Sequence, residues 1–308
     1  MENVFVFQSN RDPSLALGAW IQTRSEIGAA TDPSNKAYDS LMNAPDFELL
    51  AVNVGNTRVG AAVYCSDEQL GAGDAPSTDV KSAADMIVEL AHELNDSPHG
   101  AVVVASVNEP AAESLCAALD DRLSLAVYRV GVDLPIQLTH TLGDDHTTGV
   151  DRFLNAVAAF DTVHQACVVV DAGTAVTVDF IDGEGTFHGG AIAPGARMQL
   201  AALHEQTANL PIVDLAWPDD AEPFARTTAQ AMLAGVCVGI QGMTRALVER
   251  YAEAYGAYPT IIATGGDAEL LFKNDDLIER IVPDLTLRGI AVSAQKALDM
   301  TRAPADLI

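Results

Sequence analysis

The chain has 308 residues, of which 49% are hydrophobic and only 6% aromatic. Its 43 Asp and Glu residues far outnumber its 17 Lys and Arg residues, which gives a formal net charge of -26. This excess of negative charge disfavours broad binding to nucleic acid or to an anionic membrane. We therefore expect a globular enzyme with no nucleic-acid or membrane partner, built as one large domain or two related ones.

The four cysteines are far apart and form no Cys-x-x-Cys pair, so the sequence favours neither a zinc site nor disulfide bonds. We find no continuous apolar run of about 18 residues and no basic segment followed by an apolar one at the N-terminus, which predicts a cytoplasmic location. Residues 1–46 are rich in turn-forming residues and are interpreted as an N-terminal extension of undecided role.

The next part of the chain alternates predicted strands and helices. LLAVNV, a turn at GNT and RVGAAVYC predict a hairpin of two buried strands. Helical segments near 79–94 and 109–119 then alternate with apolar strands at 101–106 and 125–130. This alternation indicates an α/β layer.

A second, similar pattern begins near the middle of the chain. HTTGVDRFLNAVAAF has apolar residues at helical spacing and predicts a helix that begins close to Gly149, with Thr147 or Thr148 as its N-cap. ACVVVDAGTAVTVDFI follows as another strand, small-residue loop and strand. The second half thus begins with elements of the same kind as the first.

Aligning VNVGNT with VDAGTA places Asn53 opposite Asp171. Because strands and helices follow each copy, the sequence predicts a duplicated domain, with residues 47–148 as the first copy and 149–308 as the second. In each loop glycine permits close backbone approach, amides and hydroxyls can bind phosphate oxygens, and an acid can hold a cation. One such loop alone is more often an ordinary turn. Two in corresponding positions favour a site that clamps a polyphosphate.

Further segments carry a resemblance to a known family. VNVGNTRVG, TTGVDRFLNAVAA, VVDAGTAVTVD, GGAIAPGARMQLAAL, TANLP, TTAQAMLAGV, ATGGDA and LTLRGI occur in this order. Over about residues 49–298 they resemble the successive signatures of type III pantothenate kinases. The resemblance implies duplicated actin-like α/β domains of the acetate and sugar kinase/Hsc70/actin, ribonuclease H-like class, with a nucleotide cleft between them.

The resemblance also implies an activity. The expected reaction transfers the γ-phosphate of ATP to the terminal hydroxyl of pantothenate, the first step of coenzyme A biosynthesis. The expected cofactors besides ATP are Mg2+ and a monovalent cation, K+ or NH4+. A homodimer is expected, with the long helix after Thr227 as its contact.

Asp151 is the candidate catalytic base. It lies at the predicted start of a helix beside Arg152, where it should stay ionised and able to orient or deprotonate a hydroxyl, although a plain helix-terminus charge is the alternative. The resemblance assigns pantothenate binding to Gly149, Val150, Asp151, Arg152 and Thr228, with Arg152 pairing with the substrate carboxylate. For Thr228 a helix N-cap is the alternative.

The resemblance gives Asp171 to the monovalent cation and Thr174 to ATP. The expected ATP-binding residues are Asn53, Val54, Gly55, Asn56, Thr57, Arg58, Val59, Gly60 and Thr174. Gly265 and Gly266 resemble an adenosine loop, although a glycine pair at a strand end is common.

The chain departs from the family pattern at two positions. Asn53 is neutral where the family has Asp, which should weaken metal binding. Leu142 stands where the family tends to have Tyr and removes a hydroxyl from the substrate wall. Three readings therefore stay open: a pantothenate kinase with a higher Mg2+ requirement, a catalytically impaired ligand-binding or regulatory homologue, and a kinase for another small hydroxyl substrate.

Overall fold

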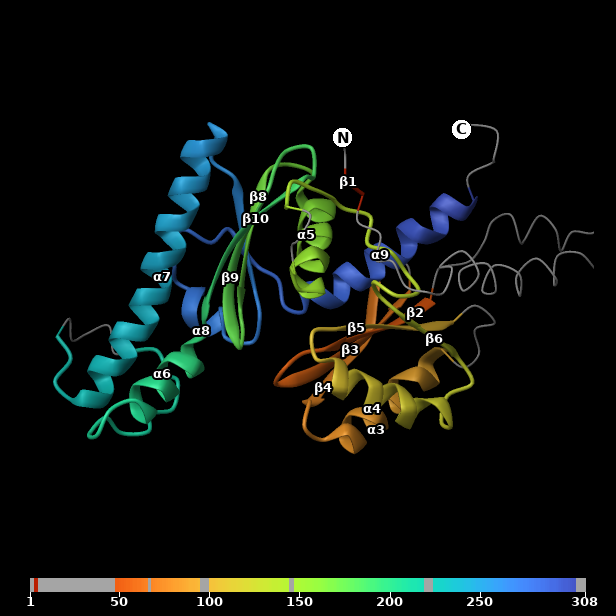
Figure 1. Cartoon of the computed structure of the whole chain (residues 1–308), viewed down its shortest axis with the longest axis horizontal. Helices are drawn as coiled ribbons and strands as arrows, with labels where there is room; N and C mark the ends of the chain where they lie inside the picture. Colours follow the sequence, from red (N-terminus) through yellow and green to blue (C-terminus); the bar gives the residue numbers. More distant parts are fainter. Residues whose placement is uncertain are drawn as a thin grey trace, which may run out of the picture. The chain divides into compact units, whose positions relative to one another are not determined.

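The computed structural model describes residues 3–4, 48–65, 68–94, 100–143, 147–218 and 224–302. Nearly all of the expected N-terminal extension, residues 1–46, lies outside the described residues. The described residues divide into two compact units (Figure 1). The first-half unit contains residues 48–137 and 290–302, and the second-half unit contains residues 3–4 and 138–289.

The first-half unit is built on a five-stranded sheet in the order β4-β3-β2-β5-β6. Its strands are β2 (Glu48–Val54), β3 (Arg58–Cys65), β4 (Glu68–Pro76), β5 (Ala101–Ser106) and β6 (Ala126–Arg129). β2, β3 and β4 are antiparallel, whereas β5 and β6 run parallel to β2. Helices α3 (Val80–Ala91) and α4 (Glu109–Asp120) lie together on one face of this sheet, and the 3-10 turn η1 (His92–Leu94) follows α3 (Figure 1).

The second-half unit has a seven-stranded sheet in the order β1-β7-β10-β9-β8-β11-β12. Its strands are β1 (Asn3–Val4), β7 (Thr139–His140), β8 (Cys167–Ala172), β9 (Ala175–Ile181), β10 (Phe187–Pro194), β11 (Thr260–Thr264) and β12 (Arg280–Ile281). Helix α5 (Val150–Val163) covers one face and α7 (Thr228–Tyr255) the other (Figure 1). The remaining helices are α6 (Ala196–Glu205), α8 (Ala268–Phe272) and α9 (Leu285–Arg302).

The two sheets repeat one topology, which confirms the predicted duplication. Numbered within each copy, β4-β3-β2-β5-β6 and β10-β9-β8-β11-β12 both read third, second, first, fourth, fifth strand, with an antiparallel meander followed by parallel strands. β7 and β1 extend the second sheet beyond β10. Asn53 pairs across to Gly60 and Ala105. Asp171 pairs across to Thr177 and Thr264, the same positions in its own sheet. The fold is therefore a duplicated actin-like α/β fold.

The division between the units differs from the division expected from the sequence. The expected first copy ends at residue 148, whereas the structural division falls after Gln137. The reason is strand pairing, because β7 already pairs with β10 of the second-half unit. The end of the chain also departs from the expectation, because α9 is divided between the units after Gly289.

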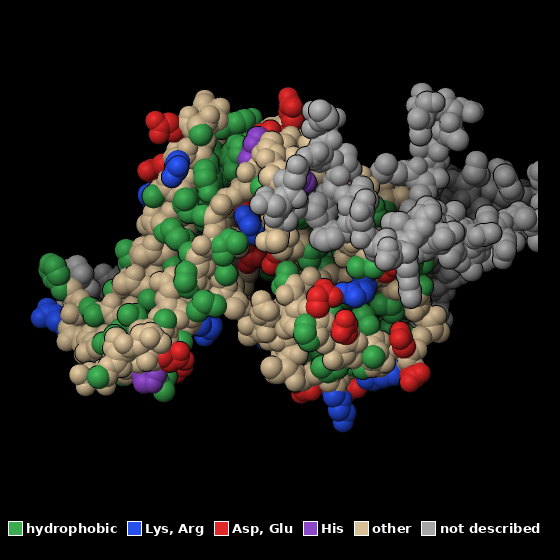
Figure 2. Space-filling view, viewed as in Figure 1, with side chains coloured by type: hydrophobic (Ala, Val, Ile, Leu, Met, Phe, Trp, Pro, Cys, Tyr) green, Lys and Arg blue, Asp and Glu red, His purple; other side chains and the backbone are tan. Residues whose placement is uncertain are grey.

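Helix α7 is more apolar than the sequence reading anticipated. It has 28 residues and contains an 18-residue window of mean hydropathy 1.5, of which 33% is buried. By length and composition alone it could cross a membrane, the single such helix in the described part of the chain. Much of α7 that does not face the sheet is thus exposed and apolar, and hydrophobic side chains are visible along it (Figure 2).

Candidate active site

The site is built around the first turn of α5. Gly149 is the N-cap residue, with an extended backbone (φ -60°, ψ 142°) and no side-chain capping bond, so the predicted N-cap at Thr147 or Thr148 is wrong. Asp151 takes over part of the capping role, because its Oδ1 accepts a hydrogen bond of 2.8 Å from the backbone N–H of Arg152. Gly149, Val150, Asp151 and Arg152 therefore form the N-cap and the first turn of α5.

Arg152 is fixed by a partner that the sequence reading missed. Its Nε donates to Asp179 Oδ2 at 2.9 Å, and its Nη2 bonds Asp179 Oδ1. The side chains of Arg152 and Asp179 are only 12% and 3% exposed. The guanidinium carbon also lies 5.8 Å from the centre of the Phe187 ring. Arg152 is thus a buried, ion-paired group, and only its remaining N–H donors can serve a ligand.

Asp179 could have been suspected from its surroundings. It follows VTV in β9, where an acid interrupts a strand that is otherwise buried. A buried carboxylate needs a charged or hydrogen-bonding partner, because desolvation otherwise makes it costly. What the sequence did not give was the identity of that partner, which comes from a different element.

Two positions of the GGAIAPG segment, Gly190 and Gly195, have no room for a side chain. Gly190 pairs with Asp179 across the β9–β10 ladder, and a Cβ on Gly190 would lie 2.6 Å from Asp179 Oδ1 and 2.0 Å from the Val178 carbonyl oxygen. A Cβ on Gly195 would lie 2.2 Å from the Gly173 carbonyl oxygen. Only glycine therefore allows β10 to pass Asp179, and α6 to begin against the β8–β9 loop.

Asp171 is held by a second chain of polar side chains. Asn155 Nδ2 donates to Asp171 Oδ2 at 2.9 Å, and Thr286 Oγ1 donates to Asn155 Oδ1 at 2.8 Å. Asn155 is 2% exposed and Thr286 is 8% exposed. The sequence reading missed both residues, although an Asn among the apolar residues of α5 is a signal that a buried partner exists.

Three carboxylates of the site, the buried Asp179 and the half-buried Asp151 and Asp171, have raised pKa values. Burial, reinforced by the negative charge of Asp151, raises the pKa of Asp171 to about 6, while the Asn155 hydrogen bond opposes this. Burial also raises the pKa of Asp151 above its usual range, against the opposing effect of the Arg152 backbone N–H and charge. For Asp179 burial raises the pKa and Arg152 opposes it. The site therefore combines several carboxylates with one guanidinium, an arrangement in which a cation would be stabilised.

The surroundings of Asp171 fit a cation that prefers oxygen ligands. A Cβ on Gly265 would lie 2.5 Å from Asp171 Oδ1 and 2.4 Å from the Ala172 carbonyl oxygen, so the glycine leaves this space open. Oxygen donors suit hard cations such as K+ and Mg2+. Within the described residues no group of three or more His, Cys, Asp or Glu side chains could hold a metal ion. A cation at Asp171 would thus need backbone, water or phosphate oxygens as well.

The two predicted threonines lie at the ends of elements in the second-half unit. Thr174 is exposed in the short loop between β8 and β9. Thr228 is exposed and is the first residue of α7, whose N-cap is Thr227 in a capping box with Gln230. The alternative reading of Thr228 as an N-cap is therefore wrong, and its hydroxyl is not committed to that role.

The predicted ATP hairpin lies in the first-half unit. It comprises the end of β2 with Asn53 and Val54, the loop Gly55, Asn56 and Thr57, and the start of β3 with Arg58, Val59 and Gly60. Gly55 N–H donates to the Arg58 carbonyl at 2.9 Å, and Ser77 binds the carbonyls of Asn56 and Thr57. Val54 and Val59 are buried, so only their backbone could reach a ligand. Arg58 is exposed and paired with Asp74.

We predict that Asp171→Asn changes the pH dependence of stability. With a folded pKa of about 6 against 3.8 for an unperturbed Asp, the folded state binds a proton more tightly than the unfolded state, so wild type loses stability as pH rises through this range. Between pH 5 and pH 7 the loss is about 1 kcal/mol relative to the variant. Urea unfolding at pH 5, 6 and 7 measures it. A wild-type-minus-variant difference that stays constant with pH would contradict the buried carboxylate.

Comparisons with known proteins identify the family of this chain. A family model described as type III pantothenate kinase matches residues 49–250. A type III pantothenate kinase of Rhodospirillum rubrum is 37% identical over 253 residues, covering 79% of this chain and 96% of the relative. One of Paramagnetospirillum magneticum is 36% identical over 251 residues, covering 79% and 95%. The solved activator of the 2-hydroxyisocaproyl-CoA dehydratase from Clostridium difficile has a TM-score of 0.47 at 13% identity, covering 83% of this chain and 96% of that one. The chain belongs to the type III pantothenate kinase family.

Proposed function

We propose that the protein transfers the γ-phosphate of ATP to the terminal hydroxyl of pantothenate, in the first step of coenzyme A biosynthesis. The observation that carries the proposal is the start of α5, where Asp151 and an anchored Arg152 are adjacent in a chain of this family. A cytoplasmic location is part of the proposal, since the reaction uses ATP.

Asp151 serves as the base. It accepts the proton of the substrate hydroxyl as that oxygen bonds to the γ-phosphorus and the bond from phosphorus to the ADP oxygen breaks. Burial raises the pKa of Asp151, which makes its carboxylate a stronger base than an exposed Asp. Gly149 and Val150 line the substrate beside it, and Thr228 offers a hydroxyl.

Arg152 orients the substrate through its carboxylate. Because Asp179 already neutralises its charge, Arg152 acts through directed N–H donors rather than as a free positive charge. Leu142, which packs towards Gly189, gives the proposed substrate wall an apolar surface where the family tends to have the hydroxyl of a Tyr. Directed hydrogen bonds from Arg152, more than electrostatic attraction by its charge, therefore hold the proposed substrate.

ATP binds through the hairpin from Asn53 to Gly60 and through Thr174. Bound Mg2+ would neutralise charge on the transferring phosphate, and a monovalent cation, K+ or NH4+, would lie at Asp171. Asn53 can offer an amide oxygen to water or metal but lacks the charge of a carboxylate. A higher Mg2+ requirement follows from this difference.

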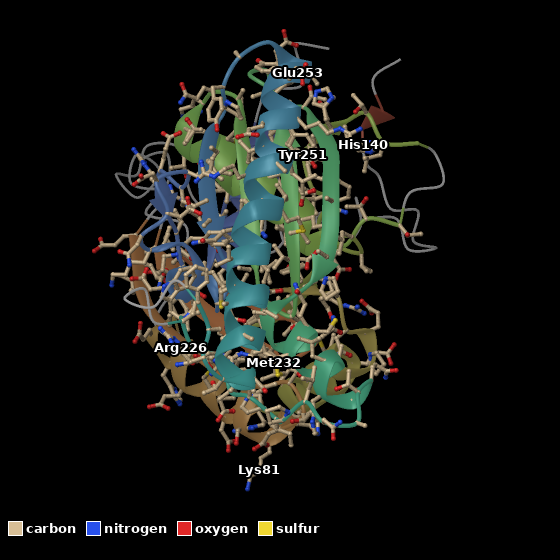
Figure 3. The ribbon with its side chains drawn as sticks, turned by 90° about the vertical axis from the view of Figure 1, so that its left-hand side faces the viewer. Lys81, His140, Arg226, Met232, Tyr251 and Glu253 are labelled. Atoms are coloured by element: carbon tan, nitrogen blue, oxygen red, sulfur yellow. The ribbon has the colours of Figure 1, made fainter. Side chains whose placement is uncertain are left out.

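The proposed assembly is a homodimer formed through α7. The exposed face of this helix carries small apolar residues at helical spacing: Ala231, Gly235, Val238, Gly239, Gly242 and Ala246. A groove of about 630 Å³ between α6 and α7, lined by Met198 and Leu203 among others, continues this face. Figure 3 looks onto α7, with Met232 near its start and Tyr251 towards its end. Exposed apolar surface of this extent supports a subunit contact.

The kinase reaction is tested directly with wild type and Asp151→Asn. ADP release is followed with pantothenate, ATP, Mg2+ and K+, and kcat is expected to fall about 100-fold or more in the variant, because the hydroxyl loses its base. Circular dichroism checks that the variant is folded. Absence of phosphorylated product from wild type at any Mg2+ concentration would favour the nonenzymatic ligand-binding homologue instead.

Restoring the acid at position 53 should lower the metal requirement. Asn53→Asp is expected to decrease the Mg2+ concentration for half-maximal rate several-fold, because a carboxylate holds a hard cation better than an amide. The matched control is Asn56→Asp, which adds the same charge to the same loop. Equal effects of the two changes would show that general charge, not position 53, decides the requirement.

The dimer is tested by placing a charge on α7. Val238 is 55% exposed, and Val238→Asp should convert dimer to monomer in sedimentation-velocity measurements, because a contact of small apolar residues excludes an unpaired charge. Leu70→Asp, at a residue 52% exposed on β4 of the other unit, should leave the dimer intact. A monomeric wild type would refute this assembly.

A further inference from the structure

We propose that Asn155 and Thr286 form a positioning pair that fixes the carboxylate of Asp171 for cation binding. This role rests on the proposed function of Asp171 as the monovalent-cation ligand. Asn155 lies in TTGVDRFLNAVAA and Thr286 in LTLRGI, but the family resemblance assigned neither residue a role. Their role follows from the hydrogen bonds that join α9, α5 and β8 in sequence.

The direction of the chain is fixed chemically. An ionised carboxylate can only accept hydrogen bonds, so the amide nitrogen of Asn155 must face Asp171 Oδ2, at 2.9 Å. The amide oxygen of Asn155 then faces away and accepts from Thr286 Oγ1, at 2.8 Å. Without the Thr286 hydroxyl this oxygen would be a buried acceptor with no donor, because Asn155 is 2% exposed. Thr286 therefore holds the amide in the orientation that Asp171 requires.

The start of α9 is placed to deliver Thr286. A Cβ on Gly289, one turn further along, would lie 2.2 Å from the Leu154 carbonyl oxygen, so α9 and α5 touch through their backbones at this point. The Leu285 N–H also donates to Thr264 Oγ1 at 3.4 Å. Thr264 is the β11 residue that pairs with Asp171. These contacts bring α5, α9 and β11 together around one carboxylate.

The two carboxylate oxygens of Asp171 therefore have different roles. Oδ2 is occupied by Asn155, while Oδ1 lies on the side that Gly265 leaves open. Because the Asn155 hydrogen bond already orders the Asp171 carboxylate, a cation can bind at Oδ1 with little further loss of side-chain entropy. Partners that orient a metal ligand typically contribute 10- to 100-fold to metal affinity or activity.

The experiment compares Asn155→Leu, Thr286→Val and Thr286→Ser with wild type. The K+ concentration for half-maximal rate should rise about 10-fold or more in Asn155→Leu. It should rise less, in the same direction, in Thr286→Val, which keeps the shape of Thr but loses the hydroxyl. Thr286→Ser retains the hydroxyl and should stay close to wild type. The KM for pantothenate should be unchanged throughout.

A second readout does not depend on turnover. The unfolding midpoint is measured while choline chloride is replaced by KCl at constant ionic strength. Wild type and Thr286→Ser should be stabilised by K+, and Thr286→Val and Asn155→Leu much less so. A wild type without K+ stabilisation, or a Thr286→Val that responds as wild type does, would overturn the proposal. If wild type forms no product, the proposed function fails, while the unfolding series still decides the role of the pair.

Discussion

The second-half unit is organised by the burial of several carboxylates beside one guanidinium. Asp151, Asp171 and Asp179 all have raised pKa values because partial or full burial disfavours their charged forms, and Arg152 is bound to Asp179 in a bidentate pair. Buried charges are tolerated only when each has a partner. The Arg152–Asp179 pair and the Asn155–Asp171 hydrogen bond supply these partners. Asp151, which is half-buried, is stabilised instead by the backbone N–H and the charge of Arg152.

The need to bring these partners together explains why glycine stands at particular positions of the backbone. β10 can pass Asp179 only because Gly190 has no side chain, and α9 can approach α5 only because Gly289 has none. The glycines of the GGAIAPG and LTLRGI segments therefore serve by leaving room for a neighbouring backbone. The site therefore depends on glycines that lack a side chain as much as on the polar side chains that line it.

Duplication makes the contrast between Asn53 and Asp171 informative. Both residues occupy the same register in equivalent sheets, so the backbone offers the same place for an acid in each unit. Asp171 has Asn155 as a dedicated partner, whereas Asn53 is a neutral residue, half-buried on β2. The two copies thus keep one fold while differing in charge at their corresponding loops. The weaker Mg2+ binding proposed for the first copy rests on this difference.

Local patterns predicted the hairpins, the repeat and the start of α5, because alternating apolar runs and small-residue loops are properties of short segments. They did not predict Asp179, Asn155 or Thr286 as partners, since each pairs with a residue on another element. The N-cap was also misplaced, because the cap of α5 lies one residue after Thr148, at Gly149, which has no side chain to form a capping bond. Likewise the choice between Thr227 and Thr228 depended on Gln230, one turn inside α7.

In the proposed reaction, the start of α5 directs phosphate to the terminal hydroxyl of pantothenate. The most direct measurement is mass spectrometry of pantothenate after incubation with wild type, ATP, Mg2+ and K+, with fragmentation to locate the phosphate. Phosphate on the terminal hydroxyl, formed by wild type and not by Asp151→Asn, is the predicted result. Unmodified pantothenate with wild type, or equal product with both proteins, would contradict the account.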